Sequence, residues 1–408
     1  MDQKILAKNR LKVVIIFVAI FFVVLFSSTQ QAFSSAEYVE DEINLQDDSS
    51  IKNKDGEMFT AVTPTTYSNA SNAAIARSRL VTINENGRNV LPAAPDYTAQ
   101  QIMQLNLFED VVLTVVQDRI EVNESGSYTW IGHVDGDDFS DVILVINGPY
   151  LSGHITMPTG SYNITSTTGN IHRIAELNSA AILSGADDSV KVEPPNDDTI
   201  ALAPEASDDG SVIDLMIIYT DDAVAAHGIP TLQSWIETYV AYANQAYINS
   251  NIAQRISLVH TEEVAYTETG SLDNALDDVQ NTNHPELGIV HTRRNTYHAD
   301  LVMLLVNNDG DGGSCGGLAS VPVTVTPAFE SSSFGTMEAC SFGASVFAHE
   351  LGHNMGSNHD WYVSASTTPY PYAPPSKYTA QSQSPPAHPA DPHPAPPSPP
   401  TSWAQCPR

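Results

Sequence analysis

The residues best suited to chemistry lie near the C-terminal end, in the run from His349 to Asp360, which reads HELGHNMGSNHD. In a helix, His349 and His353 stand four residues apart on one face, so both imidazoles can reach the same cation. Zinc is commonly held by such imidazoles. Glu350, beside the first histidine, is then placed to act as the general base toward a water molecule.

His359 is the third candidate ligand, but a continuous helix would carry it roughly 240° around and about 9 Å further on from His353. The helix must therefore end between them. Gly356 can end it, because a residue without a Cβ readily adopts the left-handed conformation that turns a chain back. Three neutral imidazoles leave a fourth position for water, whose pKa on zinc falls to roughly 7.

The alternative is a set of ordinary helix histidines beside a surface glutamate, which is the usual interpretation of a lone histidine. Three His, one Glu, one Gly and one Asp at fixed spacing make that alternative improbable here. The sequence therefore predicts a metal site formed by His349, His353 and His359, with Glu350 as the catalytic base.

At these residues the chain resembles the metzincin clan of zinc endopeptidases, whose HExxHxxGxxH pattern is matched at every specified position. With Asp360 after the third histidine, the chain resembles the adamalysin or reprolysin branch. Within that branch it looks most similar to secreted bacterial peptidyl-Asp metalloendopeptidases. This resemblance implies a zinc endopeptidase acting on protein or peptide substrates, with Asp360 orienting the turn. It also implies an α/β (α+β) catalytic domain with a mixed twisted sheet and an active-site helix, after a small β-rich pro-region.

The charge balance limits the partners. The chain has 17 Lys and Arg against 48 Asp and Glu, a formal net charge of −31. A strongly anionic surface disfavours binding to nucleic acid or anionic lipid. We therefore expect no nucleic-acid partner.

The first 36 residues have the pattern of a secretory signal peptide. Four basic residues precede an apolar run at 13–26, and small polar residues follow. The apolar run is short for a membrane span of about 20 residues, although an uncleaved anchor remains the alternative. We expect a secreted, extracellular protein with no stable membrane association after signal cleavage.

Composition divides the rest of the chain into five parts. We expect little order at 37–104, a β-rich propeptide-like domain at 105–184, an acidic linker and processing site at 185–210, the reprolysin-like zinc peptidase domain at 211–373, and a disordered Pro-rich tail at 374–408. A passive folding or adhesion module is the rival interpretation of 105–184.

Periodicity predicts the elements within the two domains. In the first, β-branched or aromatic runs predict strands at 111–116, 128–134, 142–146 and 154–157. In the second, we expect strands at 212–219, 255–264, 301–306 and 318–325, the last as an edge strand beside the cleft, and helices at 231–249, 271–280 and 287–297. Ser271 is the expected N-cap of the second helix.

Cys315 and Cys340 lie in the predicted catalytic region, and in an exported protein they could form a disulfide that braces the loop before the active helix. Reduced structural thiols are the alternative. No cysteine precedes Cys315. We therefore expect any inhibition by the N-terminal part to use another ligand or occlusion.

Two interpretations stay open for the loop at 307–313. Its Asn and Asp side chains could bind calcium, but the full EF-hand spacing is lacking, which favours a plain turn.

The chain departs from the family that it resembles after the third histidine. Metzincins carry a methionine in a turn beneath the metal, and no methionine follows Met355 in this sequence. We expect the Met-turn to be missing, with a frameshift near Ala373 as one cause. The alternative function is accordingly a catalytically impaired zinc-binding or adhesion protein.

Overall fold

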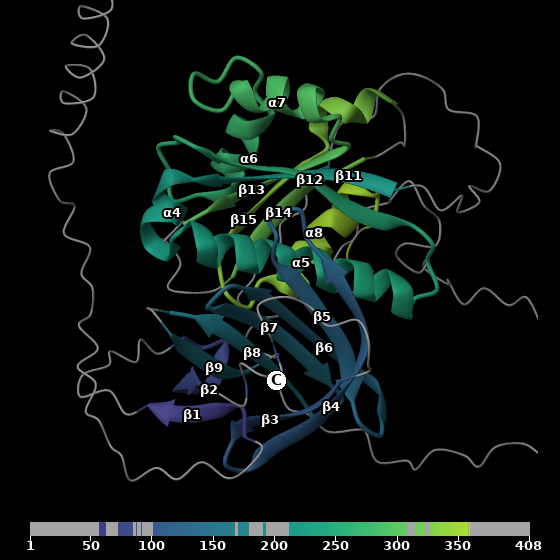
Figure 1. The fold of residues 1–408 in the computed structure, drawn as a ribbon. Helices are drawn as coiled ribbons and strands as arrows, with labels where there is room; N and C mark the ends of the chain where they lie inside the picture. The colour runs from purple at the N-terminus through teal and green to yellow at the C-terminus, as the bar shows by residue number, and fades with distance from the viewer. Residues whose placement is uncertain are drawn as a thin grey trace, which may run out of the picture.

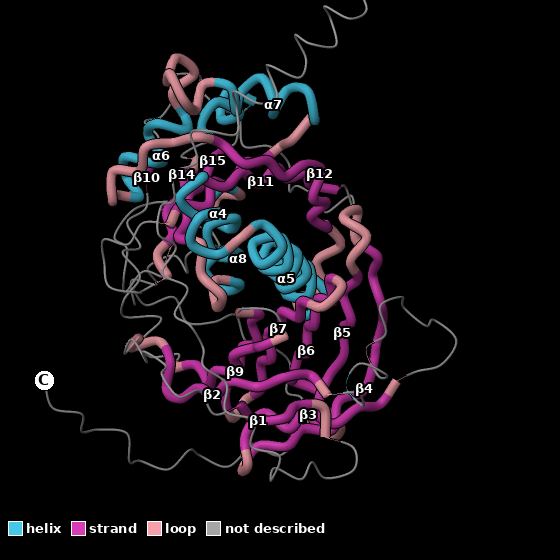
Figure 2. Tube along the Cα trace, turned by 60° about the vertical axis from the view of Figure 1, so that its left-hand side comes forward, coloured by secondary structure: helices cyan, strands magenta, loops and turns pink. Residues whose placement is uncertain are grey.

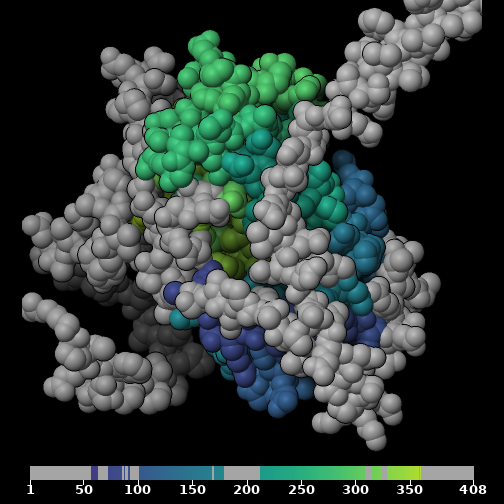
Figure 3. All heavy atoms as spheres, turned by 90° about the vertical axis from the view of Figure 1, so that its left-hand side faces the viewer, coloured from purple at the N-terminus to yellow at the C-terminus, as the bar shows by residue number. Residues whose placement is uncertain are grey.

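The molecule is built from two β-sheets with helices between and above them (Figure 1). The computed structural model describes residues 57–62, 72–84, 87, 91, 101–167, 170–178, 191–192, 212–307, 315–322, 327–357 and 359. The first sheet and its core are called the nine-stranded unit, and the second sheet with its helices is called the mixed unit. Figure 3 shows the green mixed unit above the purple and blue nine-stranded unit.

The nine-stranded unit is an antiparallel sheet in the order β1-β2-β9-β8-β7-β6-β5-β4-β3. Its strands are β1 (Phe59–Val62), β2 (Ile75–Ile83), β3 (Ile102–Phe108), β4 (Val111–Val122), β5 (Tyr128–Val134), β6 (Asp137–Asn147), β7 (Tyr150–Met157), β8 (Gly160–Ser166) and β9 (Ile171–Leu177). From β3 to β9, neighbours in sequence are neighbours in the sheet, as expected for strands joined by short turns.

The prediction of little order at 37–104 is wrong for the parts that the structure describes. β1, β2 and the start of β3 all fall in that range, so the β-rich region begins well before residue 105 and is not small. β2 pairs with β9, about ninety residues later in the chain, and Val81 is fully buried. Such strands depend on distant partners, so the local composition around them gives little signal.

Asn106 of β3 joins the two ends of this sheet. Its Oδ1 accepts hydrogen bonds from the backbone N–H groups of Met58 and Phe59 at 3.1 and 2.9 Å, and its Nδ2 donates to the Phe59 carbonyl at 2.8 Å. β1 and β3 are the outermost strands in the sheet order. The sheet therefore curls until its edges meet through one buried amide, around a core that includes Leu105, Trp130 and Leu144.

The mixed unit has a sheet in the order β10-β14-β15-β13-β11-β12. Its strands are β10 (Lys191–Val192), β11 (Val212–Thr220), β12 (Arg255–Val264), β13 (Leu301–Val306), β14 (Gly317–Val321) and β15 (Phe334–Glu338). β11, β12, β13 and β15 run parallel, whereas β14 is antiparallel to β15. β13 is buried along its whole length because helices cover both faces of the sheet.

Helices cover both faces of this mixed sheet. They are α4 (Asp221–His227), α5 (Ile229–Asn249), α6 (Leu272–Gln280), α7 (Ile289–Tyr297), α8 (Ala344–Asn354) and the short 3₁₀ helix η2 (Pro327–Ser332). Figure 2 shows α5 and α8 on the side that faces the nine-stranded unit, with α6 and α7 on the other. Thr220 and Ser271 cap α4 and α6 by accepting backbone N–H bonds, so the prediction for Ser271 is confirmed.

Most predicted elements of the mixed unit are confirmed. The strands predicted at 255–264 and 301–306 match β12 and β13, and the helix predicted at 231–249 matches α5 to within two residues. The predicted linker at 185–210 contains the short strand β10. The strand predicted at 318–325 is β14, but the prediction that it is the edge strand is wrong, because β10 pairs with its outer side. The signal peptide and the Pro-rich tail lie outside the described residues. Among the helices that are described, none is long and apolar enough to cross a membrane.

Candidate metal centre

α8 carries the first two predicted ligands and is anchored by its apolar face. Ala344, Phe347 and Leu351 follow helical spacing, are at most 1% exposed and belong to the core between α8, α5 and the mixed sheet. Phe347 packs against Tyr239 of α5 with ring centroids 5.5 Å apart. This packing fixes the direction in which His349 and His353 leave the helix.

The end of α8 is a Schellman motif formed around Gly356. Gly356 has φ 92°, and its N–H donates to the His353 carbonyl at 2.8 Å. The N–H of Ser357 reaches the Gly352 carbonyl at 2.9 Å, which completes the motif. The chain turns back at this glycine, and the turn carries His359 toward the other two imidazoles.

The three predicted ligands converge. His359 Nε2 lies 3.2 Å from His349 Nε2 and 3.1 Å from His353 Nε2, and the three possible ligand atoms all lie within 4.8 Å of one another. Nitrogens bound tetrahedrally to zinc at about 2.05 Å would be about 3.3 Å apart. The spacing and the donor chemistry of these residues therefore fit a zinc ion. Within the part of the chain that the structure describes, no other group of three His, Cys, Asp or Glu converges in this way.

A backbone carbonyl orients the second ligand. His353 is 2% exposed, and its Nδ1 lies 2.9 Å from the Ser357 carbonyl oxygen. Because a carbonyl can only accept, Nδ1 must carry the proton, which leaves the lone pair of Nε2 directed at the shared position. The turn made by Gly356 thus serves two purposes, since it positions both His359 and this carbonyl.

Glu350 of α8 is buried against the start of β14. It is 1% exposed, and a Cβ built on Gly317 would lie 2.6 Å from its Oε1 and 2.7 Å from its Cγ. Gly317 therefore lets the strand backbone approach the carboxylate, as a glycine inside a strand often does. Gly317 was not predicted as a site residue, although the glycine pair Gly316-Gly317 at the start of an apolar run was a signal for it.

A disulfide between Cys315 and Cys340 braces this end of the sheet. The two Cα atoms are 6.0 Å apart, within the normal range for a disulfide. The cystine lies against the start of α8, since a Cβ on Gly343 would come 3.0 and 3.1 Å from its two sulfur atoms. It thereby ties the ends of β14 and β15 to the helix that carries the histidines.

Asn354 is a second residue that sequence analysis missed. It is 4% exposed, and its Nδ2 donates to the carbonyls of Ser320 on β14 and Phe334 on β15 at 2.9 and 3.0 Å. The amide holds the last turn of α8 against both strands. Its only signal in the sequence was a polar residue between two specified positions of the motif.

Two predictions fall outside the described residues. Asp360 lies there, and so do residues 308–313, which are most of the candidate calcium loop. Asn307, the first residue of that loop, is described, and its N–H donates to Glu268 Oε1 at 2.8 Å.

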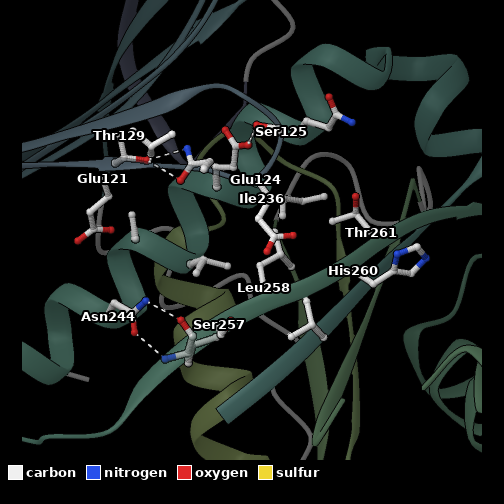
Figure 4. Close-up of a pocket in the computed structure, with 18 residues that line it drawn as sticks. Glu121, Glu124, Ser125, Thr129, Ile236, Asn244, Ser257, Leu258, His260 and Thr261 are labelled. Carbon is white, nitrogen blue, oxygen red and sulfur yellow. Dashed lines mark hydrogen bonds between the residues drawn. The ribbon is translucent and has the colours of Figure 1, made fainter. Parts of the chain in front are cut away.

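A cavity of about 450 Å³ lies away from the histidines. Figure 4 shows it between the β4–β5 turn, α5 and β12, with Glu121, Glu124 and His260 among its lining residues. None of the residues of the HELGH motif lines it. It marks a gap between the two units and does not belong to the metal centre.

Comparison with known proteins agrees with this geometry. The model of metallopeptidase family M12, in its reprolysin-like form, matches residues 209–385. The match includes all three histidines and continues past Ala373, where the peptidase domain was expected to end. A peptidyl-Asp metalloendopeptidase of Stenotrophomonas maltophilia is 30% identical over 305 residues, covering 70% of this chain and 71% of that protein. The chain belongs to metallopeptidase family M12, a metzincin-like group.

Two further similarities complete the comparison. A peptidyl-Asp metalloendopeptidase of Xanthomonas campestris is 29% identical over 290 residues, which cover 67% of each chain. Among solved structures, metalloproteinase-II from Bacteroides fragilis is 14% identical, with a TM-score of 0.42, over 68% of this chain and 86% of that one.

Proposed function

We propose that this protein is an exported zinc endopeptidase in which His349, His353 and His359 hold the metal and Glu350 is the general base. The observation that carries the proposal is the convergence of three imidazole nitrogens next to a helix residue whose carboxylate is buried. Membership of a metallopeptidase family supports hydrolysis of peptide bonds.

The residues have distinct tasks in this reaction. Zinc, when bound, supplies Lewis acidity toward the scissile carbonyl and acidifies a water molecule. Glu350 accepts the proton of the attacking water and returns it to the leaving amine, so no covalent intermediate with the protein is needed. Gly317 and Asn354 keep β14 close to α8, so that a substrate backbone lying along that strand stays near Glu350.

Substrate class and location are proposed from the relatives, from the first residues of the sequence and from the disulfide. The relatives are named for cleavage at aspartyl residues, and we propose the same preference for this chain. Export is supported by the leader-like first 36 residues and by the Cys315–Cys340 disulfide, since disulfides persist mainly in oxidising compartments. N-terminal sequencing of the protein recovered from the medium tests both ideas, because self-processing in the acidic 185–210 segment would leave a new N-terminus beside an aspartate.

Replacing the base tests the proposal. Glu350→Gln keeps the shape of the side chain and removes the proton acceptor, so hydrolysis of an unstructured protein substrate falls by about a hundred-fold to ten-thousand-fold. Zinc content stays at the wild-type level, because Glu350 is not a ligand. Glu263→Gln, at an exposed position on β12, is the matched control and retains full activity. Equal activity of wild type and Glu350→Gln would refute the assignment.

The alternative function is a catalytically impaired protein that has the same metal centre. In that case the chain binds zinc without turnover and acts as a binding or adhesion protein. Full zinc occupancy with no chelator-sensitive hydrolysis by the wild type would favour this second function.

A further inference from the structure

The outer edge of β12 borders the cavity of Figure 4. Among the described strands, β12 is the last in the order of the mixed sheet, so only β11 pairs with it. The cavity, of about 450 Å³, runs along residues 256–261 of this strand, with α5 and the β4–β5 turn as its other walls (Figure 4). Its volume falls within the range of about 300–1,000 Å³ that ligand sites commonly have. An unpaired strand edge therefore borders a space large enough for a ligand.

An asparagine side chain imitates a neighbouring strand at one end of this edge. Asn244 Oδ1 accepts from the N–H of Ile256 at 2.8 Å, and Asn244 Nδ2 donates to the Ile256 carbonyl at 2.9 Å. These are the two bonds that an added strand can make with one residue. Backbone groups of alternate strand residues point to the same edge, so those of Leu258 face the same side as those of Ile256. Among the described residues, no side chain plays this part at Leu258, so the edge is closed at Ile256 and open beyond it.

A β-bulge interrupts the inner pairing of β12 at the same place. Two consecutive residues of β11, at positions 215 and 216, pair with Leu258 and His260. Val259 lies between them, has no partner on β11 and lines the cavity. The extra residue of a bulge is unpaired, and bulges are frequent at sheet edges and next to active sites. This stretch of β12 can therefore offer backbone donors and acceptors to an extended peptide, which would bind by strand addition.

The side chains around the cavity determine the kind of peptide that fits. Three glutamates line it, Glu121, Glu124 and Glu237, and no Lys or Arg is among the described residues that do so. Glu121 is paired with Arg119, and Glu237 accepts from two serines, whereas Glu124 is exposed in the β4–β5 turn. Val122 also lines the cavity and is 62% exposed. A peptide with alternating basic and apolar side chains matches both the carboxylates and the apolar surface.

We propose that this cavity binds an extended segment of a partner protein that carries Lys or Arg, and that the segment adds as a strand to the outer edge of β12 beside Leu258 and Val259. The formal net charge of −31 favours the approach of a basic partner as well. β12 belongs to the mixed unit and the β4–β5 turn to the nine-stranded unit, so the form that binds is the intact chain. The site lies away from the three histidines and does not depend on the proposed hydrolysis.

Binding of a labelled peptide to the intact Glu350→Gln chain tests the proposal, with the base replaced so that the peptide stays uncut. The probe is the fluorescent pentapeptide KVKVK, whose anisotropy should show saturable binding about tenfold tighter than that of EVEVE. Methylation of the backbone nitrogens at its residues 1, 3 and 5, or at 2 and 4, removes the donors on one edge of the peptide. One methylated form should bind about tenfold more weakly than the other, because a single edge faces β12. Equal affinity of the two methylated forms overturns strand addition, and equal affinity of KVKVK and EVEVE overturns the preference for a basic peptide.

Charge reversal in the β4–β5 turn locates the site. Glu124→Lys should weaken binding of KVKVK about threefold to tenfold, because it replaces an exposed carboxylate beside the cavity with a like charge. Asp138→Lys is the matched control, since Asp138 is exposed at the start of β6, beyond the other end of β5, and does not line the cavity. It changes the net charge equally and should leave the affinity unchanged. An equal loss in the two variants, or no loss in Glu124→Lys, overturns the site.

Hydrogen exchange locates the bound peptide independently. With KVKVK at ten times its Kd, exchange of the amides in β12 should slow by about tenfold, as expected for a ligand that must leave before the strand edge opens. Protection that spares β12 overturns the proposal. None of these measurements needs turnover, so their failure leaves the proposed hydrolysis intact, and a failure of hydrolysis leaves the peptide site intact.

Discussion

The two faces of α5 make contacts of different kinds. Toward α8 and the mixed sheet, the helix presents Leu232, Ile236, Tyr239 and Ala243, all at most 3% exposed and part of one apolar core. Toward the nine-stranded unit, it presents polar side chains that bond across the seam. The same helix is thus a wall of the metal centre on one side and a dock for the N-terminal sheet on the other.

The seam is held by individual hydrogen bonds. Across it, Trp235 Nε1 donates to Thr165 at 2.9 Å, Thr238 to Ser152 at 3.1 Å, Arg119 to Gln245 at 2.8 Å and Asn249 to Asp141 at 2.8 Å, while Ser125 and Ser127 donate to Glu237. Its apolar part consists of Ile131, Ile143 and Ala241, with Tyr242 against them, and of Ala74, Ala175 and Leu177, which join the core of the mixed unit. The cavity of Figure 4 lies along the same seam.

The apolar contact of α5 with α8 and the mixed sheet is therefore permanent, whereas its polar contact with the nine-stranded unit can be released. Net hydrogen bonds contribute about 1 kcal/mol each, and contacts between units of one chain commonly resemble transient interfaces. Removal of the nine-stranded unit would uncover polar groups that water can satisfy, together with the small apolar part of the seam. Removal of the apolar side would destroy the metal centre.

The largest expected effect comes from the apolar face. Tyr239→Ala removes a fully buried ring that packs on Phe347, and should lower the free energy of unfolding of the mixed unit by about 3–5 kcal/mol. Because α8 loses its support, zinc affinity falls as well. Chemical denaturation with zinc analysis measures both. A loss below about 1 kcal/mol would show that this face is not the stronger one.

Glu237 tests the polar side. Glu237→Ala leaves the buried hydroxyl of Ser127 without its acceptor and should cost about 1–3 kcal/mol. The cost should appear as faster hydrogen exchange in the β4–β5 hairpin and on the face of α5 toward the nine-stranded unit, with zinc content unchanged. Glu237→Gln keeps a carbonyl acceptor and is the matched control. Loss of zinc in Glu237→Ala would contradict the separation of the two faces.

His154 gives the seam a pH dependence. It is buried on β7, packs edge-on against Tyr242 of α5, and burial lowers the pKa of its imidazole to about 4. The folded state therefore resists protonation, and its stability falls as pH drops from about 6.5 toward 4. Between pH 7 and 5 the expected loss is at most about 2 kcal/mol.

The His154→Leu variant isolates this term. Burial raises the pKa values of Glu237 and Asp141, and those carboxyls act in the opposite sense. The difference in unfolding free energy between wild type and variant should therefore change with pH, whatever the total does. A difference that is constant from pH 7 to 5 would rule out His154 as the cause.

The smallest effect is expected at the exposed rim of the seam. Asn249→Ala removes a bond to Asp141 that water can replace, so the free energy of unfolding should change by no more than about 0.5 kcal/mol. A larger loss, measured by thermal unfolding, would mean that the seam is more cooperative than its separate bonds imply.

The metal centre was the most predictable part of the molecule, because its residues lie within eleven positions of one another. Helical spacing places His349 and His353, and the conformational freedom of Gly356 accounts for the return of His359. Contacts that stabilise this motif from far away were not predictable. Gly317 and Asn354 reveal their function only once β14 lies beside α8.

The nine-stranded unit was predicted only where its strands follow one another. The runs at 128–134 and 142–146 lie in β5 and β6, neighbours joined by a short turn. β2 was missed, and its partner β9 is distant in sequence, whereas β3, β8 and β9 were missed although each of them also pairs with a neighbour in sequence. The seam was missed because Thr238 and Gln245, polar residues on a helix, have the pattern of a solvated face.

The central claim is that three imidazoles share one zinc ion, and X-ray absorption at the zinc edge tests it most directly. The account predicts one zinc per chain with three histidine nitrogens at about 2.0–2.1 Å, and loss of one nitrogen in His359→Ala. A folded protein that retains no zinc after reconstitution, or a zinc whose ligands are unchanged by His359→Ala, would contradict it.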